Sequence, residues 1–404
     1  MTHQAAVSRG VSRLAFDAGV ALTELVESMH HNISRAPGVL GRPQVGPTTG
    51  LTGLIYRGVK SAMRLAGRGV DAVLAQLGPV LGDAAPSPSR DALLSALNGV
   101  VGDHLVATDN PLAIPMRLRV DGEPLQLNRR TLAAAISRPS GRVAILVHGL
   151  CLNDRHWNRK GHDHGAALAR DLGYTPLYLH YNSGLHISTN GRALAEMLEN
   201  LVKQWPVPIE EITIIAHSMG GLVARSACYY GTQATQAWRP RLRNLVFLGT
   251  PHHGTPLERG GHWLDFLIGK SPYTAPLTGI GRIRSAGITD LRYGNIVDED
   301  WQGRSKFDHA GDTRQVMPLP LGVRCHAIAG TAGPRGGGAI IGDGLVPVDS
   351  ALGQHKEPGR DLSLPKSRRW IARSVNHLEL LNRREVYEQI RKWLAPSASA
   401  ALSE

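Results

Sequence analysis

Apolar residues recur at helical spacing in the first part of the chain. Over residues 11–29, and again over 51–77, an apolar side chain returns every third or fourth position, as on one buried face of a helix. Prolines 86 and 88 break this pattern, and a shorter helix is predicted at 91–101. We therefore expect a helical N-terminal region over residues 1–108.

Beyond residue 110 the pattern changes to short apolar runs that alternate with helical segments, as in a parallel sheet. Residues 114–120 alternate like a strand, and Asp121-Gly122 is a turn signal that would return the chain at 124–127. Further strands are expected at 143–147, 175–180, 212–215, 245–248, 325–329 and 370–375. Helices are expected at 165–172, 191–204, 219–230 and 378–394. The pattern predicts an α/β domain over residues 109–396 and a disordered tail over 397–404.

A serine stands where one of these strands meets a helix. The β-branched run 212–215 leads into the letters AHSMGG at 216–221, and helical spacing follows. This is the G-x-S-x-G nucleophile elbow, with Ala216 in place of the first glycine. The turn is so tight that the positions two before and two after Ser218 must be small, as Ala216 and Gly220 are. Ser218 is the predicted nucleophile; the alternative is a serine that only ends an ordinary turn.

The loop after the first parallel strand has the sequence His148-Gly149-Leu150-Cys151. An activated serine that attacks an ester needs two backbone N–H donors for the oxyanion, one from the residue after the nucleophile and one from this loop. We expect Met219 and Leu150 to supply them, with Cys151 as the alternative to Leu150. His148, Gly149 and Cys151 are predicted to lie around the substrate, although His148 is better suited to bracing the loop.

Candidates for the acid and the base lie later in the chain. Asp343 stands in a Gly-flanked loop past the 325–329 strand, where it can orient an imidazole; Asp349 is the rival, and an Asx turn is the structural alternative. Among 18 histidines, His377 is favoured because it follows the last strand. His217 must point away from the tight turn, and His252 ends another strand; we expect both close to the substrate pocket.

Several motifs together resemble one family. They are VHGLC (147–151), AHSMGG (216–221), LGTPHHGT (248–255), GDGLVPVDSA (342–351) and NHLELL (376–381). Residues 110–396 resemble α/β-hydrolases of the lipase type, in particular bacterial lipases and the GPI inositol-deacylase-like group. The resemblance implies a mostly parallel central sheet flanked by helices, and the chain order Ser218, Asp343, His377 for nucleophile, acid and base. It also implies acyl transfer from a hydrophobic or lipid ester to water, with no cofactor.

An insert at 259–320 interrupts the alternation of strands and helices with mixed apolar and Gly/Pro-rich sequence. We expect it to form a cap or lid over the pocket. Its apolar run at 263–268 would meet an acyl chain or pack down on the body, and the sequence leaves both open.

Composition narrows the class of protein. The net charge is +12, yet the basic residues are dispersed and only 5% of residues are aromatic, so we do not expect nucleic-acid binding. Three cysteines are too few for a disulfide framework, and the histidines show no spacing that predicts a metal site. The chain has neither a leader-like start nor ~18 uninterrupted apolar residues, so we expect a cytoplasmic protein.

The helix expected at 51–77 carries a basic stripe opposite its apolar face, made by Arg57, Lys60, Arg64 and Arg68. Such a helix docks on the body or lies on a membrane or polymer granule. The second case would make the protein an intracellular polyester depolymerase of the polyhydroxyalkanoate type, or a membrane-surface hydrolase. A non-enzymatic scaffold with a hydrolase fold is the remaining alternative. The sequence does not fix the oligomeric state.

Overall fold

The computed structural model describes residues 88–255, 285–303, 312–332 and 342–396. An eight-stranded sheet crosses this part of the chain in the order β2-β1-β4-β3-β5-β6-β7-β8. Each predicted strand has a counterpart. The bounds of β4 are those predicted, and the other strands have at least one shifted end: β1 Arg117–Val120, β2 Glu123–Pro124, β3 Arg142–Val147, β4 Thr175–His180, β5 Glu211–His217, β6 Leu242–Leu248, β7 Arg324–Thr331 and β8 Arg369–Arg373.

The first two strands form a hairpin at one edge of the sheet. β1 pairs antiparallel with both β2 and β4. The turn residues Asp121 and Gly122 have φ angles of 52° and 82°, and positive φ at both central positions is the mark of a type I′ turn. The predicted Asp-Gly turn is therefore confirmed, although β1 begins three residues later than expected and β2 is only two residues long.

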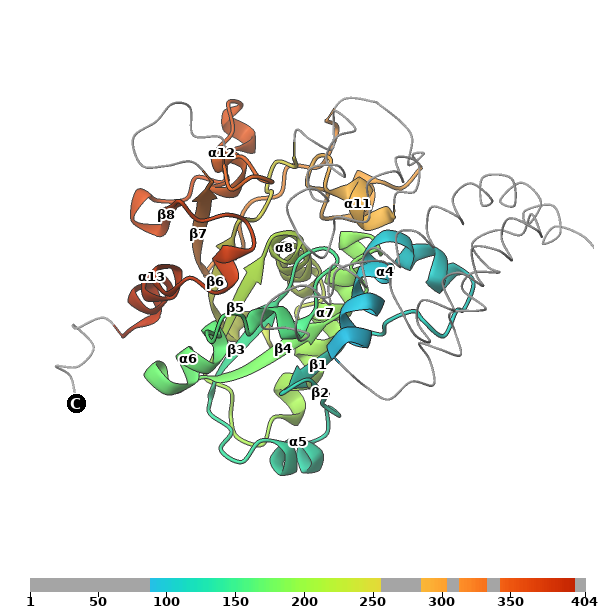
Figure 1. Cartoon of the computed structure of the whole chain (residues 1–404), viewed down its shortest axis with the longest axis vertical. Helices are drawn as coiled ribbons and strands as arrows, with labels where there is room; N and C mark the ends of the chain where they lie inside the picture. The colour runs from blue at the N-terminus through green and yellow to red at the C-terminus, as the bar shows by residue number, and fades with distance from the viewer. Residues whose placement is uncertain (1–87, 256–284, 304–311, 333–341, 397–404) are drawn as a thin grey trace, which may run out of the picture.

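The other six strands run parallel, and the central ones, β3, β5, β6 and β7, are buried on both faces along most of their length. In β3, Val143, Ile145 and Val147 point into one core, where α4, α7 and α8 also contribute. The alternating Ala144 and Leu146 point into a second core with α6 and α13. Figure 1 shows these two groups of helices on opposite sides of the sheet. Apolar residues on both faces explain why these strands appear in the sequence as continuous apolar runs.

Eight α-helices are present in the described ranges. They are α4 Pro88–Ala107, α5 Arg129–Ala135, α6 His164–Leu172, α7 Ile187–Gln204, α8 Met219–Gln233, α11 Ala286–Asp290, α12 Val348–Ala351 and α13 Arg384–Leu394. Three of them, α5, α11 and α12, were not predicted because each is too short for a periodic pattern. Capping groups do mark α5, whose first turn is held by the Asn128 side chain, which accepts from the Thr131 N–H at 2.9 Å.

Helix α4, which lies within the helical N-terminal region predicted over residues 1–108, packs on the body of the domain; the boundary at residue 108 is still a prediction. Leu97, Val100 and Leu105 are at most 1% exposed and join the core on the α7 and α8 side of the sheet. The helix also continues past the predicted end, with a kink at Val101 (φ −131°). The apolar face seen in the sequence is thus the face that docks on the sheet domain. Residues 1–87 and 397–404 lie outside the described part of the chain.

The described part of the predicted cap insert packs onto this body. Helix α11 buries Ile288 completely, and the Ser285 hydroxyl, which caps α11, donates to the Gly99 carbonyl of α4 at 2.7 Å. The apolar run 263–268 and the helix expected at 51–77 lie outside the described residues. Within the described ranges, no helix is long and apolar enough to span a membrane.

The strand order and the crossing helices are those of the α/β-hydrolase fold, with a helix entering directly after β5. In a parallel sheet the loops at the carboxyl ends of the strands meet at one edge, which is where ligands bind. The loops after β3, β5, β6, β7 and β8, which carry the predicted site residues, all leave the sheet at this edge.

Candidate active site

Ser218 occupies the turn between β5 and α8 in a conformation that L-residues rarely adopt, with φ 55° and ψ −128°. The turn is held because the Ser218 N–H donates to the Leu248 carbonyl at the end of β6, at 2.8 Å. Positive φ in a residue with a side chain is a strained state that the surrounding structure must stabilise. The side chain is only half-buried, so this strained turn presents its hydroxyl at the surface of the site.

Small residues allow the β3 loop to approach this turn. A methyl group added at Gly149 would lie 2.9 Å from the Ser218 Cβ, and one at Gly220 would lie 2.6 Å from the carbonyl oxygens of Val147 and His148. Each glycine therefore fits because it lacks a side chain. The interlocked loops bring Leu150, the predicted oxyanion donor, next to the predicted nucleophile.

The two predicted oxyanion donors have free N–H groups. Among the described residues, no acceptor binds the backbone N–H of Leu150 or of Met219, the first residue of α8. The Cys151 N–H, by contrast, donates to the Ser183 hydroxyl at 3.1 Å. This contact favours Leu150 over Cys151 as the donor. Burial also raises the pKa of the Cys151 thiol to about 12, which keeps it protonated and unreactive.

His377 and Asp343 are in direct contact, with Nδ1 and Oδ2 2.7 Å apart. The other carboxylate oxygen accepts from the N–H groups of Leu345 and Val346, each at 2.9 Å. Because the ionised carboxylate only accepts, Nδ1 of the imidazole must be the donor, and Nε2 is then left with its lone pair. The Asp343 side chain is fully buried and that of His377 is 7% exposed. The rival Asp349 is exposed in the first turn of α12 and is not part of this contact.

Two contacts connect the Asp343–His377 pair to the serine turn. Gly249 (φ 58°) follows Leu248, whose carbonyl holds Ser218, and a methyl group there would meet Asp343 Oδ2 at 2.9 Å and His377 Nδ1 at 3.1 Å. The ring of His217 lies 4.6 Å from the ring of His377, centroid to centroid. The structure therefore gathers Ser218, Asp343 and His377, three residues distant in sequence, at one edge of the sheet.

The three other histidines predicted near the pocket are fully buried. His148 stacks on Tyr181 at 4.3 Å and contacts the Gly149 carbonyl through Nδ1 at 2.8 Å, and burial lowers its pKa to about 4. His217 and His252 have pKa values well below 6.5, with burial as the main cause. All three are thus buried, neutral rings, and their direct contact with a substrate is still a prediction.

Sequence analysis missed the residues that support the oxyanion loop from behind. The Tyr181 hydroxyl donates to the His148 carbonyl at 2.9 Å, and Ser183 holds Cys151. Helix α4 presses on the same loop, since a methyl group at Gly99 would lie 2.3 Å from the Cys151 Sγ. Their position in the sequence could have indicated this role. Residues 181–184 follow β4 directly, and because β4 pairs with β3 they lie beside the loop that follows β3.

No group of three or more histidine, cysteine, aspartate or glutamate side chains is arranged to hold a metal ion in the described ranges. All three cysteines of the chain are buried and unpaired.

Comparisons with known proteins give the following matches. A family model described as a domain of unknown function (DUF7379) matches residues 123–274. A search of curated proteins gives no match. Among solved structures, the mature form of a Bacillus licheniformis lipase is 16% identical, with a TM-score of 0.43 over 69% of this chain and 97% of the lipase.

Two further structural matches are similarly distant in sequence. Aspergillus fumigatus lipase B is 11% identical, with a TM-score of 0.40 over 90% of this chain and 83% of that lipase. A Pyrobaculum calidifontis esterase is 14% identical, with a TM-score of 0.40 over 65% of this chain and 77% of the esterase. The matches do not distinguish the GPI inositol-deacylase-like group from other lipase-type hydrolases, so that finer grouping is still a prediction.

Proposed function

We propose that this protein is a serine carboxylester hydrolase that cleaves hydrophobic or lipid esters through an acyl-enzyme on Ser218. The observation that carries the proposal is the buried 2.7 Å contact between His377 Nδ1 and Asp343 Oδ2, in a loop tied to the strained serine turn. A carboxylate that fixes the imidazole tautomer beside a strained serine is the arrangement that serine hydrolases use to make a hydroxyl nucleophilic.

In the first half of the reaction, His377 Nε2 takes the proton of the Ser218 hydroxyl while Oγ attacks the ester carbonyl carbon. The carbonyl oxygen becomes an oxyanion and accepts hydrogen bonds from the N–H groups of Leu150 and Met219. The N-terminus of α8 adds favourable electrostatic potential there. Loss of one such donor typically costs about 3 kcal/mol of transition-state stabilisation.

Collapse of this tetrahedral intermediate breaks the ester bond, and the imidazolium of His377 gives its proton to the leaving alcohol. A water molecule then enters, loses a proton to His377 Nε2 and attacks the acyl-enzyme carbonyl. The second intermediate releases the carboxylic acid and returns the proton to Ser218 Oγ. Asp343 stays ionised throughout and stabilises the imidazolium, because its charge lies against Nδ1.

The test is hydrolysis of p-nitrophenyl esters from acetyl to palmitoyl by the full chain. Wild-type protein should hydrolyse them, with a preference for longer acyl groups if the substrate is a lipid. Ser218→Ala should lower kcat by a factor of about 10⁴ or more, since removal of a serine nucleophile disables the whole unit. Its unfolding temperature should match that of the wild type. Full activity in a well-folded Ser218→Ala protein would exclude the proposal.

The alternative substrates considered from sequence depend on residues 51–77, which lie outside the described residues. A granule-bound polyester and a membrane-surface lipid therefore stay predictions. Co-sedimentation of the full chain with polymer granules or with liposomes, compared with a variant lacking residues 1–87, distinguishes them.

A further inference from the structure

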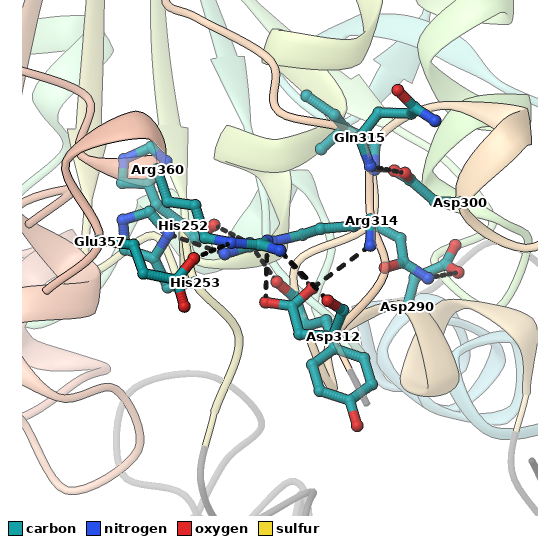
Figure 2. Close-up of polar contacts among 12 residues, drawn as sticks. His252, His253, Asp290, Asp300, Asp312, Arg314, Gln315, Glu357 and Arg360 are labelled. Atoms are coloured by element: carbon teal, nitrogen blue, oxygen red, sulfur yellow. Dashed lines mark hydrogen bonds and ion pairs between the residues drawn. The ribbon is translucent and has the colours of Figure 1, made fainter. Parts of the chain in front are cut away.

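A cavity of about 90 Å³ lies apart from the candidate active site, beside the loop that follows β6. Its wall is built by α8, by the β6 loop and by three later segments at 294–296, 314–318 and 359–362. Ser218, Asp343 and His377 are not part of this wall. Figure 2 shows polar contacts around several of the lining residues, with the Arg314 guanidinium between Asp312 and the pair His252 and His253.

Arg225 of α8 lines the cavity and is a buried cation with no carboxylate partner among the described residues. The residue is 6% exposed. One guanidinium nitrogen donates to the Met317 carbonyl at 2.6 Å, another lies 3.3 Å from His252 Nδ1, and Nε has no hydrogen-bond partner. Burial, and next the charge of Arg314, lower the pKa of Arg225 to about 10. A buried charge left uncompensated is costly, so this guanidinium favours an anion in the space beside it.

The contact with Arg225 also fixes the proton on His252. A guanidinium has no acceptor, so Nδ1 of His252 must accept and the ring proton must be on Nε2. That Nε2 is buried and has no hydrogen-bond partner within the described ranges. His252 is fully buried and neutral, because burial and the neighbouring Arg225 hold its pKa well below 6.5. The cavity wall thus contains a second donor without an acceptor.

A third donor comes from Arg360. Its Nη1 is 3.1 Å from Asp312 Oδ2, yet the approach is not aligned for a hydrogen bond, and Nη1 is buried without one. Asp312 is already shared, since its other oxygen lies 3.3 Å from Arg314 Nε. Asp361 is the acidic residue of the wall. Its carboxylate oxygens accept hydrogen bonds from the backbone N–H groups of Ser363 (2.6 Å) and His355 (3.1 Å). The acidic groups here are therefore engaged, and the groups left over are donors.

We propose that this cavity binds a small oxyanion of the phosphate, sulfate or carboxylate class. The oxygens of the anion accept from Arg225 Nε, His252 Nε2 and Arg360 Nη1, and its charge compensates the buried Arg225. One water needs only ~10–15 Å³ of such space, so the cavity has room for a tetrahedral oxyanion. Bound there, the anion ties α8 to the β6 loop and to segment 359–362. The inference does not depend on the esterase reaction, because Ser218, Asp343 and His377 do not line the cavity.

The test is calorimetric titration of the full chain with sodium phosphate, sulfate and acetate, against sodium chloride at matched ionic strength. We expect one saturable site, and a rise of the unfolding temperature that follows its occupancy, since a ligand that binds only the folded state stabilises it. Binding of phosphate and sulfate but not acetate identifies a tetrahedral oxyanion, whereas binding of acetate alone identifies a carboxylate.

Three variants make the test specific. Arg225→Gln should abolish saturable binding, and His252→Phe should weaken it tenfold or more, because each removes a donor to a charged ligand. Arg243→Gln is the matched control: it removes one exposed positive charge at the opposite end of β6 and should bind as the wild type does. Ser218→Ala should also bind unchanged, which separates this site from the esterase proposal.

The proposal is overturned if none of the three oxyanions binds saturably beyond the chloride control. It is equally overturned if Arg225→Gln or His252→Phe binds with wild-type affinity. Should Arg225→Gln fail to fold, His252→Phe alone decides, since it removes the Nε2 donor while the Arg225 charge stays in place.

Discussion

The ring of His217 donates from Nε2 to the backbone carbonyl of His377, across 2.9 Å. A carbonyl can only accept, so the proton is on Nε2, and burial keeps the ring neutral by holding its pKa well below 6.5. The residue beside the proposed nucleophile therefore holds the loop that carries the proposed base. This hydrogen bond joins the loop of the proposed nucleophile to the loop of the proposed base.

His217→Phe should keep the volume of the ring and lose the hydrogen bond. A misplacement of the base by about 1 Å can cost about 10²-fold in rate, so we expect kcat to fall by a factor of about 10 to 100 while KM changes little. Steady-state kinetics on a p-nitrophenyl ester measure both constants. His326→Phe, which replaces a buried histidine of β7 whose ring makes no hydrogen bond to any described residue, is the control and should keep wild-type kcat. Equal kcat in both variants would contradict the role of His217.

Asp343 and its rival Asp349 provide a matched pair of substitutions. Asp343→Asn leaves an amide against His377 Nδ1, which favours the wrong imidazole tautomer, and we expect kcat to fall by a factor of about 10⁴. Asp349→Asn changes an exposed residue of α12 and should leave kcat within a factor of about two. The kinetic comparison of these two variants separates the acid from its rival. A large loss in Asp349→Asn with none in Asp343→Asn would reverse the assignment.

Gly99→Ala tests whether α4 supports the oxyanion loop. An alanine in a helix is intrinsically more favourable than glycine by up to about 1 kcal/mol. Here, however, its methyl group would lie 2.3 Å from Cys151 Sγ and 3.0 Å from the Cys151 backbone nitrogen, so the loop must move. We expect kcat to fall tenfold or more, since oxyanion donors act only at a fixed distance. Unchanged kcat in a folded Gly99→Ala protein would show that the loop does not depend on α4.

His326→Phe also tests acid stability. Burial lowers the pKa of His326 to about 4 from an ordinary value of 6.5, so the unfolded chain binds this proton more readily than the folded protein does. Its contribution to the free energy of unfolding is fully present above pH 6.5 and is lost as the pH falls toward 4, by about 2 kcal/mol at pH 5. Urea unfolding at pH 7 and pH 5 should show a smaller loss of stability in the variant by this amount. An identical pH dependence in both proteins would contradict the shift.

The centre of the sheet was predictable because β3, β5, β6 and β7 are buried on both faces and so appear as apolar runs, as Val143 and its neighbours do. The packing of α4 against the sheet domain was not predictable. Its periodicity reveals an apolar face, but not that Leu97 and Val100 pack against the sheet domain. Helices such as α11 and α12 are stabilised by the contacts of single residues, Ile288 for example, and carry too few residues for a pattern.

The candidate site was likewise predictable only in part. Ser218, Asp343 and His377 follow strand ends in a fixed chain order, so position alone pointed to them. Hydrogen bonds between two loops produce no sequence motif. No motif identifies the hydrogen bond from the Cys151 N–H to Ser183, for example. The same holds for Arg225, which appears as one polar residue in an otherwise apolar stretch of α8. His252 was expected close to the substrate pocket; it is buried and lines the separate cavity, and its contact with a substrate is still a prediction.

The central claim is that His377 makes the Ser218 hydroxyl a nucleophile, and covalent labelling measures this directly. Wild-type protein treated with a fluorophosphonate should gain one phosphonyl group, and mass spectrometry of its peptides should place that group on Ser218. His377→Gln should be labelled at least about 10³ times more slowly, because no base is left to take the proton of the Ser218 hydroxyl. Labelling of another residue, or equal rates in the two proteins, would contradict the account.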